Sequence, residues 1–465
     1  MVSRLTDSQL YAHLWGTEEL RAIFEEQARL QGWLDVLVAL AQTQSELGII
    51  PTEAARAIAQ HASVDRLDLD VIASETRTTG HSTLGLIHGL QQVLPAHARE
   101  WVYYGATVQD ISDTWTALAT KQVGAILWRE LRRLEALLLE LAERHRDTLM
   151  VGRTHGQPGA PITFGYKAAA WADEIRRHLQ RLQEGAPRWL VGQLAGAVGS
   201  VAFFGDQGLE LRARFCSKLG LADPGISWTT SRDRLAEFLL LLSMATSTLA
   251  KIGTEVYELQ RPEIGELREP AGAESVGSIT MPHKRNPEIA EHLVTLSRLV
   301  RAQAVLVLEG MVQEHERDGR AWKVEWVAFP DACLLAGASL SFCTWILTGL
   351  EVNEPAMRQN LEAARGFYAS EQVLATLSPI MGKHRAQALL QEALKAGQER
   401  GLSLDDALRS SESIKPHLDP LPDLSVVLAP NPGCAPQMVD WVIRRARAAR
   451  EAEPATWPPQ RRDIR

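Results

Sequence analysis

Residues 277–287, Gly-Ser-Ile-Thr-Met-Pro-His-Lys-Arg-Asn-Pro, place a serine, a lysine and an asparagine within one short segment. Two prolines and a Gly-Ser opening are incompatible with a regular helix or strand, so the segment is predicted to be a loop. Ala/Leu-rich sequence typical of helices flanks it, and polar loops held between helices often carry catalytic groups. A serine, a lysine and an asparagine in a loop are more often merely solvated, so the roles of Ser278, Lys284 and Asn286 depend on the wider pattern.

That pattern resembles the signature loop of the fumarase/aspartase superfamily, Gly-Ser-Ser-x-Met-Pro-x-Lys-x-Asn-Pro, with Ile279 in place of the second serine. The resemblance implies that Ser278 is the catalytic base and that Lys284 and Asn286 bind the substrate carboxylate on which negative charge develops. A serine hydroxyl is far too weak a base in water, so such a loop must exclude water and surround the alkoxide with N–H donors and a cation. The pattern gives Ile279 no role.

A second polar segment, Arg-Thr-His-Gly-Gln-Pro at 153–158, places a histidine between helical stretches. Histidine is well suited to proton transfer near neutral pH, although a single histidine among 13 carries little weight alone. The segment resembles the same run in adenylosuccinate lyases, which implies that His155 is the general acid and that Thr154 orients it and contacts substrate. Relatives that are cycloisomerases tend to have an aromatic residue at this position, so His155 favours elimination over cyclisation.

A third segment, Gly-Ala-Thr-Val-Gln-Asp at 105–110, precedes a long helical pattern. Thr107 is an ordinary N-cap residue, and a helix N-terminus is also a favourable place for an anion. The segment resembles Gly-Ala-Thr-Ser-Gln-Asp of adenylosuccinate lyases and carboxymuconate cycloisomerases, which implies that Thr107 and Gln109 bind a substrate carboxylate. Val108 replaces the family serine and removes one hydroxyl donor, so we expect the specificity to differ.

Two more residues are candidates for substrate binding through the same resemblance. His81 lies among hydroxyl residues in the segment 78–85, but Ser-Thr follows it where adenylosuccinate lyases have Asp-Val. Arg232 is either a residue in a salt bridge or the arginine that the relatives direct at substrate. The segment 313–326, with Glu-His-Glu-Arg and Trp-x-x-Glu-Trp, resembles the carboxymuconate cycloisomerase branch and lacks the corresponding motif of bacterial adenylosuccinate lyases.

The elements that position these residues are predicted to be helices throughout. Apolar residues recur at helical spacing, and the stretch 235–259 is apolar on nearly all faces in its first turns, which requires burial in a bundle or subunit core. The resemblance implies an all-α fold: an N-terminal helical domain (1–104), a central bundle of long helices (105–350) and a small C-terminal helical domain (351–450). We expect a flexible tail at 451–465, and a homotetramer whose active sites are shared between subunits.

Composition excludes several classes of protein. With 45% hydrophobic residues, a net charge of −8 and a pI of about 6.0, the chain is globular and has no basic surface for nucleic acid. Four scattered cysteines indicate reduced thiols rather than a zinc site or a disulfide framework. We expect a cytoplasmic protein without a membrane partner, metal or organic cofactor.

The predicted function is that of a carbon–nitrogen lyase that releases fumarate by anti β-elimination from a small dicarboxylate, a succinyl or N-substituted aspartate compound. The leaving group is on nitrogen or oxygen, and a specialised substrate such as nitrosuccinate is favoured over adenylosuccinate. The alternatives are adenylosuccinate lyase itself, 3-carboxy-cis,cis-muconate cycloisomerase and a catalytically inactive structural relative. An inactive protein has no need of Ser278, Lys284, Asn286 and His155 together.

Overall fold

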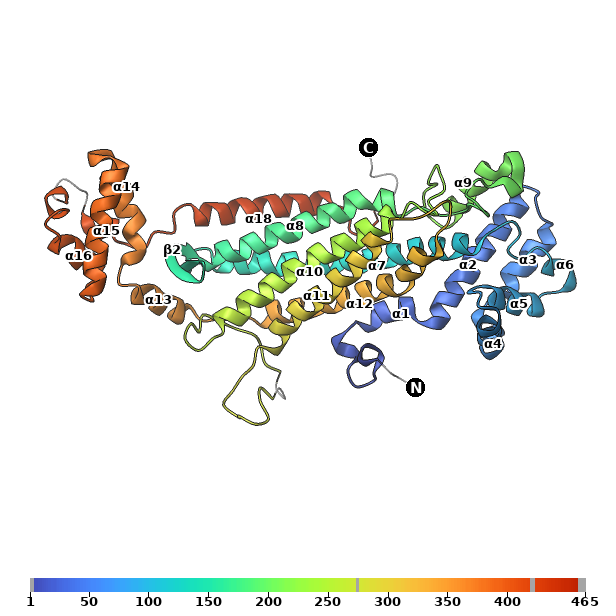
Figure 1. Ribbon diagram of the computed structural model, residues 1–465, viewed down its shortest axis with the longest axis horizontal. Helices are drawn as coiled ribbons and strands as arrows, with labels where there is room; N and C mark the ends of the chain where they lie inside the picture. The colour runs from blue at the N-terminus through green and yellow to red at the C-terminus, as the bar shows by residue number, and fades with distance from the viewer. Residues whose placement is uncertain (1–3, 273–275, 419–422, 459–465) are drawn as a thin grey trace.

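Long helices run side by side along the molecule and form its centre (Figure 1). The computed structural model describes residues 4–272, 276–418 and 423–458. The central helices are α7 (Val108–Arg144), α8 (Phe164–Trp189), α10 (Asp233–Leu259), α11 (Glu288–Glu309) and α12 (Gly319–Gly349). At a rise of about 1.5 Å per residue, α7 alone extends about 55 Å. Its two ends therefore lie in different parts of the molecule.

The core of this bundle is the buried stripe that each helix directs inward, such as Trp171, Ile175, Leu179 and Leu182 of α8. Two helices, α10 and α12, are long and apolar enough to cross a membrane by length and composition. Their most apolar windows are 72% and 67% buried against the rest of the protein. Most of each window is therefore covered by other parts of the protein, as in a core helix. All four cysteines are free.

A group of shorter helices covers one end of the bundle. They are α1 (Glu18–Phe24), α2 (Glu26–Glu46), α3 (Thr52–His61), α4 (Leu69–Thr79), α5 (Leu84–Val93) and α6 (Ala96–Arg99). The helix α9 (Gly208–Lys218) packs against α2 although it comes from the middle of the sequence. The N-terminal unit therefore includes a segment that the predicted boundary at 104 leaves out.

The opposite end carries α13 (Glu354–Ala363), α14 (Ser370–Met381), α15 (Lys383–Glu399), α16 (Leu404–Ser410) and α17 (Leu424–Val427). Buried residues between 369 and 424 form a hydrophobic core separate from the main one. The last helix, α18 (Ala435–Ala452), returns along α8 and α7 (Figure 1). This helix, which lies within the C-terminal domain expected at 351–450, packs on the bundle and not on the separate core.

Residues 451–458, the described part of the tail expected at 451–465, contact the bundle. Glu453 forms ion pairs with Arg132 and Arg176, and the Trp457 side chain is 4% exposed, packed over Gly124. These contacts bind the segment to α7 and α8. Residues 459–465 lie outside the described part of the chain.

Two small antiparallel sheets interrupt the helical fold. One is the hairpin of β1 (Leu149–Thr154) and β2 (Gln157–Thr163), and the other pairs β3 (Leu267–Arg268) with β4 (Glu351–Val352). The segment 153–158 is thus the tip of a hairpin and not a simple loop between helices.

Candidate active site

The loop 277–287 connects the region of β3 with the N-terminus of α11. The Ser278 hydroxyl oxygen accepts a hydrogen bond of 3.0 Å from the N–H of Met281. A Cβ on Gly277 would lie 2.5 Å from the carbonyl oxygen of Lys284, so only glycine allows the loop to approach itself this closely. The close approach of the loop to itself explains this glycine. Ile279, next to the serine, is 94% exposed.

Lys284 and Asn286 line an open cavity of about 1610 Å³ at this end of the bundle. Among the described residues, no carboxylate forms a salt bridge with the Lys284 ammonium group. The neighbouring Arg285 is held by the Glu269 carbonyl at 2.9 Å and by the Glu351 carboxylate at 3.3 Å. The lysine is therefore the cation of this loop that is available to an anionic ligand.

His155 lies at the exposed tip of the β1–β2 hairpin. Its φ is 52° and that of Gly156 is 74°, as a two-residue turn between antiparallel strands requires. The hairpin is anchored by Arg153, whose guanidinium donates to both oxygens of the buried Glu266 carboxylate at 2.7 and 2.8 Å. Thr154, also exposed, is the last residue of β1. The anchored hairpin thus presents the accessible imidazole of His155 at the same end of the bundle as the loop 277–287.

Thr107 and Gln109 lie at the opposite end, where α7 begins. Thr107 and Asp110 form a capping box, in which the Thr107 N–H donates to the Asp110 carboxylate at 2.9 Å. Asp110 also accepts from the N–H groups of Ala195 at 2.7 Å and Gly196 at 3.1 Å, and burial raises its pKa to about 7. This carboxyl group therefore fastens the glycine-rich segment 192–199 to the start of α7.

Gln109 is 1% exposed, and its amide nitrogen donates to the Thr229 carbonyl at 2.8 Å. Its side chain therefore holds the segment 228–232 and, as placed here, offers no donor to an open site. Thr107 differs, because its hydroxyl accepts a hydrogen bond of 2.9 Å from the exposed Arg317. No role for Arg317 was predicted from the sequence. Its only signal was the Glu-His-Glu-Arg resemblance.

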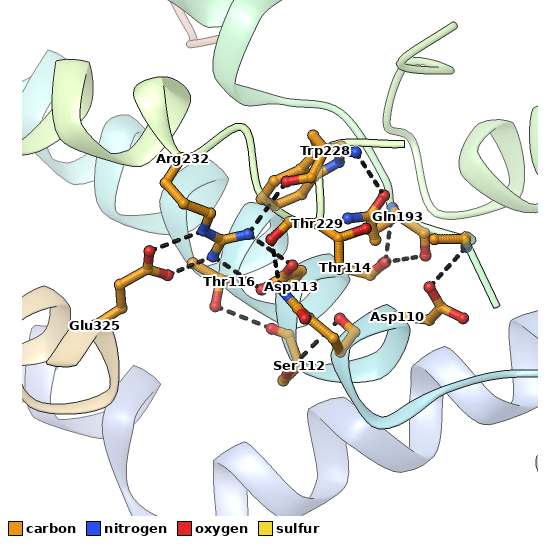
Figure 2. A network of polar contacts seen from close by, with 12 residues as sticks. Asp110, Ser112, Asp113, Thr114, Thr116, Gln193, Trp228, Thr229, Arg232 and Glu325 are labelled. Carbon is orange, nitrogen blue, oxygen red and sulfur yellow. Dashed lines mark hydrogen bonds and ion pairs between the residues drawn. The ribbon is translucent and has the colours of Figure 1, made fainter. Parts of the chain in front are cut away.

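The Arg232 side chain is fully buried, and each of its nitrogen atoms has protein partners (Figure 2). Its guanidinium donates two hydrogen bonds to the Asp113 carboxylate, at 2.8 and 3.0 Å, and one to the Trp228 carbonyl at 3.4 Å. It also donates to both oxygens of the Glu325 carboxylate, at 2.8 Å for the bond from Nε. Of the two expected roles, the structure shows the salt bridge, and no donor remains for a substrate. Arg232 thus connects α7, α12 and the segment before α10.

His81 lies between α4 and α5 in the N-terminal unit, with an exposed side chain. Its Nδ1 accepts a hydrogen bond of 3.2 Å from the N–H of Leu84, as a residue that caps α5 does. The other ring nitrogen has no hydrogen bond to the described residues and is accessible. Capping and substrate binding are both compatible with this geometry.

The candidate residues thus form two groups at opposite ends of the bundle (Figure 1). Ser278, Lys284, Asn286 and His155 lie at the end where α7 finishes, and Thr107 lies where it begins, about 55 Å away along the helix. A single chain cannot bring the two groups together. In the described segments, no group of three or more His, Cys, Asp or Glu side chains is arranged to hold a metal ion.

Known proteins resemble this chain over most of its length. A family model described as lyase matches residues 15–302. N-acetyl-S-(2-succino)cysteine lyase from Dickeya dadantii (strain 3937) is 41% identical over 96% of this chain and 98% of that protein. The protein of the same name from Enterococcus italicus is 40% identical over 89% of this chain and 91% of its own length.

The crystal structure of 3-carboxy-cis,cis-muconate lactonizing enzyme from Pseudomonas putida has a TM-score of 0.86 and 32% identity, covering 95% of this chain and 99% of that one. The superfamily and the all-α fold expected from the loop 277–287 are confirmed. The chain belongs to the lyase family of the fumarase/aspartase superfamily, in the branch of the adenylosuccinate lyases and carboxymuconate cycloisomerases, and it is a fumarate-releasing lyase.

Proposed function

We propose that the enzyme releases fumarate from N-acetyl-S-(2-succino)cysteine or a closely similar S-(2-succino) thiol. The observation that carries this proposal is that two relatives from different bacteria, 41% and 40% identical over most of the chain, bear that one name. The leaving atom is then sulphur, in place of the nitrogen or oxygen expected from the sequence.

In the proposed reaction, Ser278 removes a proton from the methylene carbon next to one carboxylate of the succinyl group. The aci-carboxylate formed is bound by Lys284 and Asn286, and the bond between the neighbouring carbon and sulphur then breaks to give fumarate and the thiol. The N–H of Met281, already 3.0 Å from the serine oxygen, is the kind of donor that stabilises an alkoxide. The exposed position of Ile279 leaves room for the loop to close over the substrate.

His155 would donate a proton to the leaving sulphur. A thiol has a pKa of about 8.5, far below that of an amine or alcohol acting as the departing group, so a thiolate leaves with less help from an acid. We therefore expect His155→Ala to slow the release of fumarate from an S-succino compound less than from an N-succino compound.

A complete site requires more than one chain in this proposal. Thr107 and Arg317 of one copy would bind a second carboxylate of a substrate whose reacting carbon lies near Ser278 of another copy. Exposed apolar side chains on α11 support association of copies, and they include Leu299, Val305, Leu306 and Leu308. We propose that the oligomer is a homotetramer and that it acts in the cytoplasm.

The test is ultraviolet detection of fumarate with a panel of succinyl compounds. The panel contains N-acetyl-S-(2-succino)cysteine, S-(2-succino)cysteine, adenylosuccinate, argininosuccinate, aspartate and nitrosuccinate, with carboxymuconate assayed in parallel. The highest kcat/KM is expected for the S-succino compounds, and Ser278→Ala should abolish it. A preference for an N-succino compound, or consumption of carboxymuconate alone, would contradict the proposal.

A further inference from the structure

A second cavity, of about 70 Å³, lies where α2, α7 and α12 meet. Its lining contains no residue assigned above to the substrate. Four tryptophans surround it, namely Trp33 of α2, Trp115 of α7, and Trp322 and Trp326 of α12. Trp326 is 39% exposed, so the cavity lies at the surface and is accessible from solvent.

Arg29 of α2 lies at this cavity with its guanidinium 5.1 Å from the centre of the Trp115 ring. Its Nε is buried and has no acceptor among the described residues, and no carboxylate of the described chain lies within salt-bridge distance of the side chain. The indole N–H of Trp33 is also buried without an acceptor. Two donors without partners, one of them charged, therefore meet at one cavity.

The acidic residues at the cavity accept no hydrogen bond from Arg29. Asp113 and Glu325 both line it, yet both are occupied by Arg232 on their other side (Figure 2). A buried donor without an acceptor is unfavourable, and the partly exposed Arg29 has no carboxylate partner in the described chain. The polar part of the cavity is therefore complementary to an anion with two oxygen acceptors.

The tryptophan rings and Phe329 make most of the remaining lining apolar, and the hydroxyls of Ser112 and Thr116, which also line the cavity, donate to carbonyls of their own helix. The aromatic rings favour a small alkyl group through dispersion contacts. A volume of 70 Å³ is about half that of an apolar cavity that holds benzene, which is about 150 Å³. The space therefore fits a chain of about two or three carbons better than an aromatic ring.

We propose that this cavity is an accessory binding site for a short-chain monocarboxylate such as propionate, distinct from the substrate site. The carboxylate accepts hydrogen bonds from Arg29 and from the Trp33 indole, and the alkyl group lies between the tryptophan rings. The proposal goes beyond the lyase activity and does not depend on which succinyl compound is the substrate.

The experiment titrates the full-length enzyme with sodium propionate, followed by calorimetry and tryptophan fluorescence. Propionamide, which has nearly the same shape without the charge, and sodium chloride are titrated in parallel. Saturable binding of propionate is expected, with affinity about tenfold to hundredfold lower for propionamide, because a hydrogen bond to a charged group is lost. Binding of chloride as tight as that of propionate would overturn the proposal.

Variants locate the binding. Arg29→Gln should weaken propionate about tenfold to hundredfold. Arg56→Gln, which changes an exposed arginine paired with Glu53 on α3, should leave binding unchanged. If Arg29→Gln does not fold, Trp33→Phe removes the indole donor and keeps a ring, and it too should weaken binding.

Lys284→Ala distinguishes this cavity from the candidate active site. Propionate binding that persists in Lys284→Ala and is lost in Arg29→Gln supports the proposal. Binding that is lost only in Lys284→Ala, or that is unchanged in both Arg29→Gln and Trp33→Phe, overturns it. The result stands whether or not fumarate is released from the S-succino compounds.

Discussion

Replacing Arg232 by methionine tests whether this arginine stabilises the fold or binds the substrate. Methionine fills similar space but removes the guanidinium that neutralises Asp113 and Glu325, whose side chains are 2% and 5% exposed. Removing one partner of a buried ion pair costs about 3–5 kcal/mol, because the remaining charge is buried without compensation. Here two carboxylates lose one shared partner, so we expect a loss in the upper part of that range.

The assay is urea unfolding followed by circular dichroism, with Arg56→Met as the matched control. Arg56 forms an exposed pair with Glu53 at 3.2 Å, and such pairs contribute only about 0–1 kcal/mol. Adding Glu325→Gln to Arg232→Met should recover part of the stability, since one unpaired charge is removed. Unfolding at the wild-type urea concentration together with loss of kcat/KM would refute the structural role and restore the role in substrate binding.

Three further predictions concern the loop, a buried histidine and the C-terminal segment. Gly277→Ala should lower kcat/KM about tenfold to hundredfold, because its Cβ meets the Lys284 carbonyl. Gly272→Ala, whose Cβ would meet no atom of the described residues within 4 Å, should have no effect, and equal activities of the two variants would contradict this. Burial lowers the pKa of His178 to about 4, so between about pH 6.5 and pH 4 the unfolded chain binds a proton that the folded chain does not. The free energy of unfolding should therefore fall as the pH drops through this range. In urea unfolding, the free energy of His178→Gln should depend less on pH than that of the wild type. Trp457→Ala should reduce the free energy of unfolding by about 3–5 kcal/mol in urea titrations, and an unchanged value would mean that the segment is not bound to the bundle.

The parts of the site that the sequence predicted are those carried by side chains at fixed local spacing. The loop 277–287 is one such segment, and the start of α7 is another, where Thr107 and Asp110 form the expected cap. The long apolar helices were predictable for the same reason, because their periodicity is local. The stripe on α8 is buried as its spacing required.

The roles that the sequence could not predict are those of residues whose partners lie far away along the chain. Arg232 is structural because Asp113 and Glu325, 119 and 93 residues away, meet at its guanidinium. Trp457 is buried because Gly124 leaves space for its ring, which no pattern near the C-terminus indicates.

The hairpin at 149–163 was also missed. Two prolines in β2 argue against a strand, and such residues are tolerated at the edge of a small sheet. The His-Gly pair between the strands was the available signal, because a two-residue turn needs positive φ at both positions. In the same way, only the folded chain shows that the two groups of site residues lie at opposite ends of α7.

Mixing two inactive variants tests most directly whether the site is completed between copies of the chain. Ser278→Ala and Arg317→Met change opposite ends of the bundle, and each alone should lose nearly all fumarate release. When the two are co-expressed in equal amounts, about one quarter of the sites in a random mixed oligomer would combine an intact Ser278 with an intact Arg317. Recovery of about a quarter of the wild-type activity is the result we predict. No recovery in mixed oligomers, or full activity of Arg317→Met alone, would contradict a site shared between the two ends.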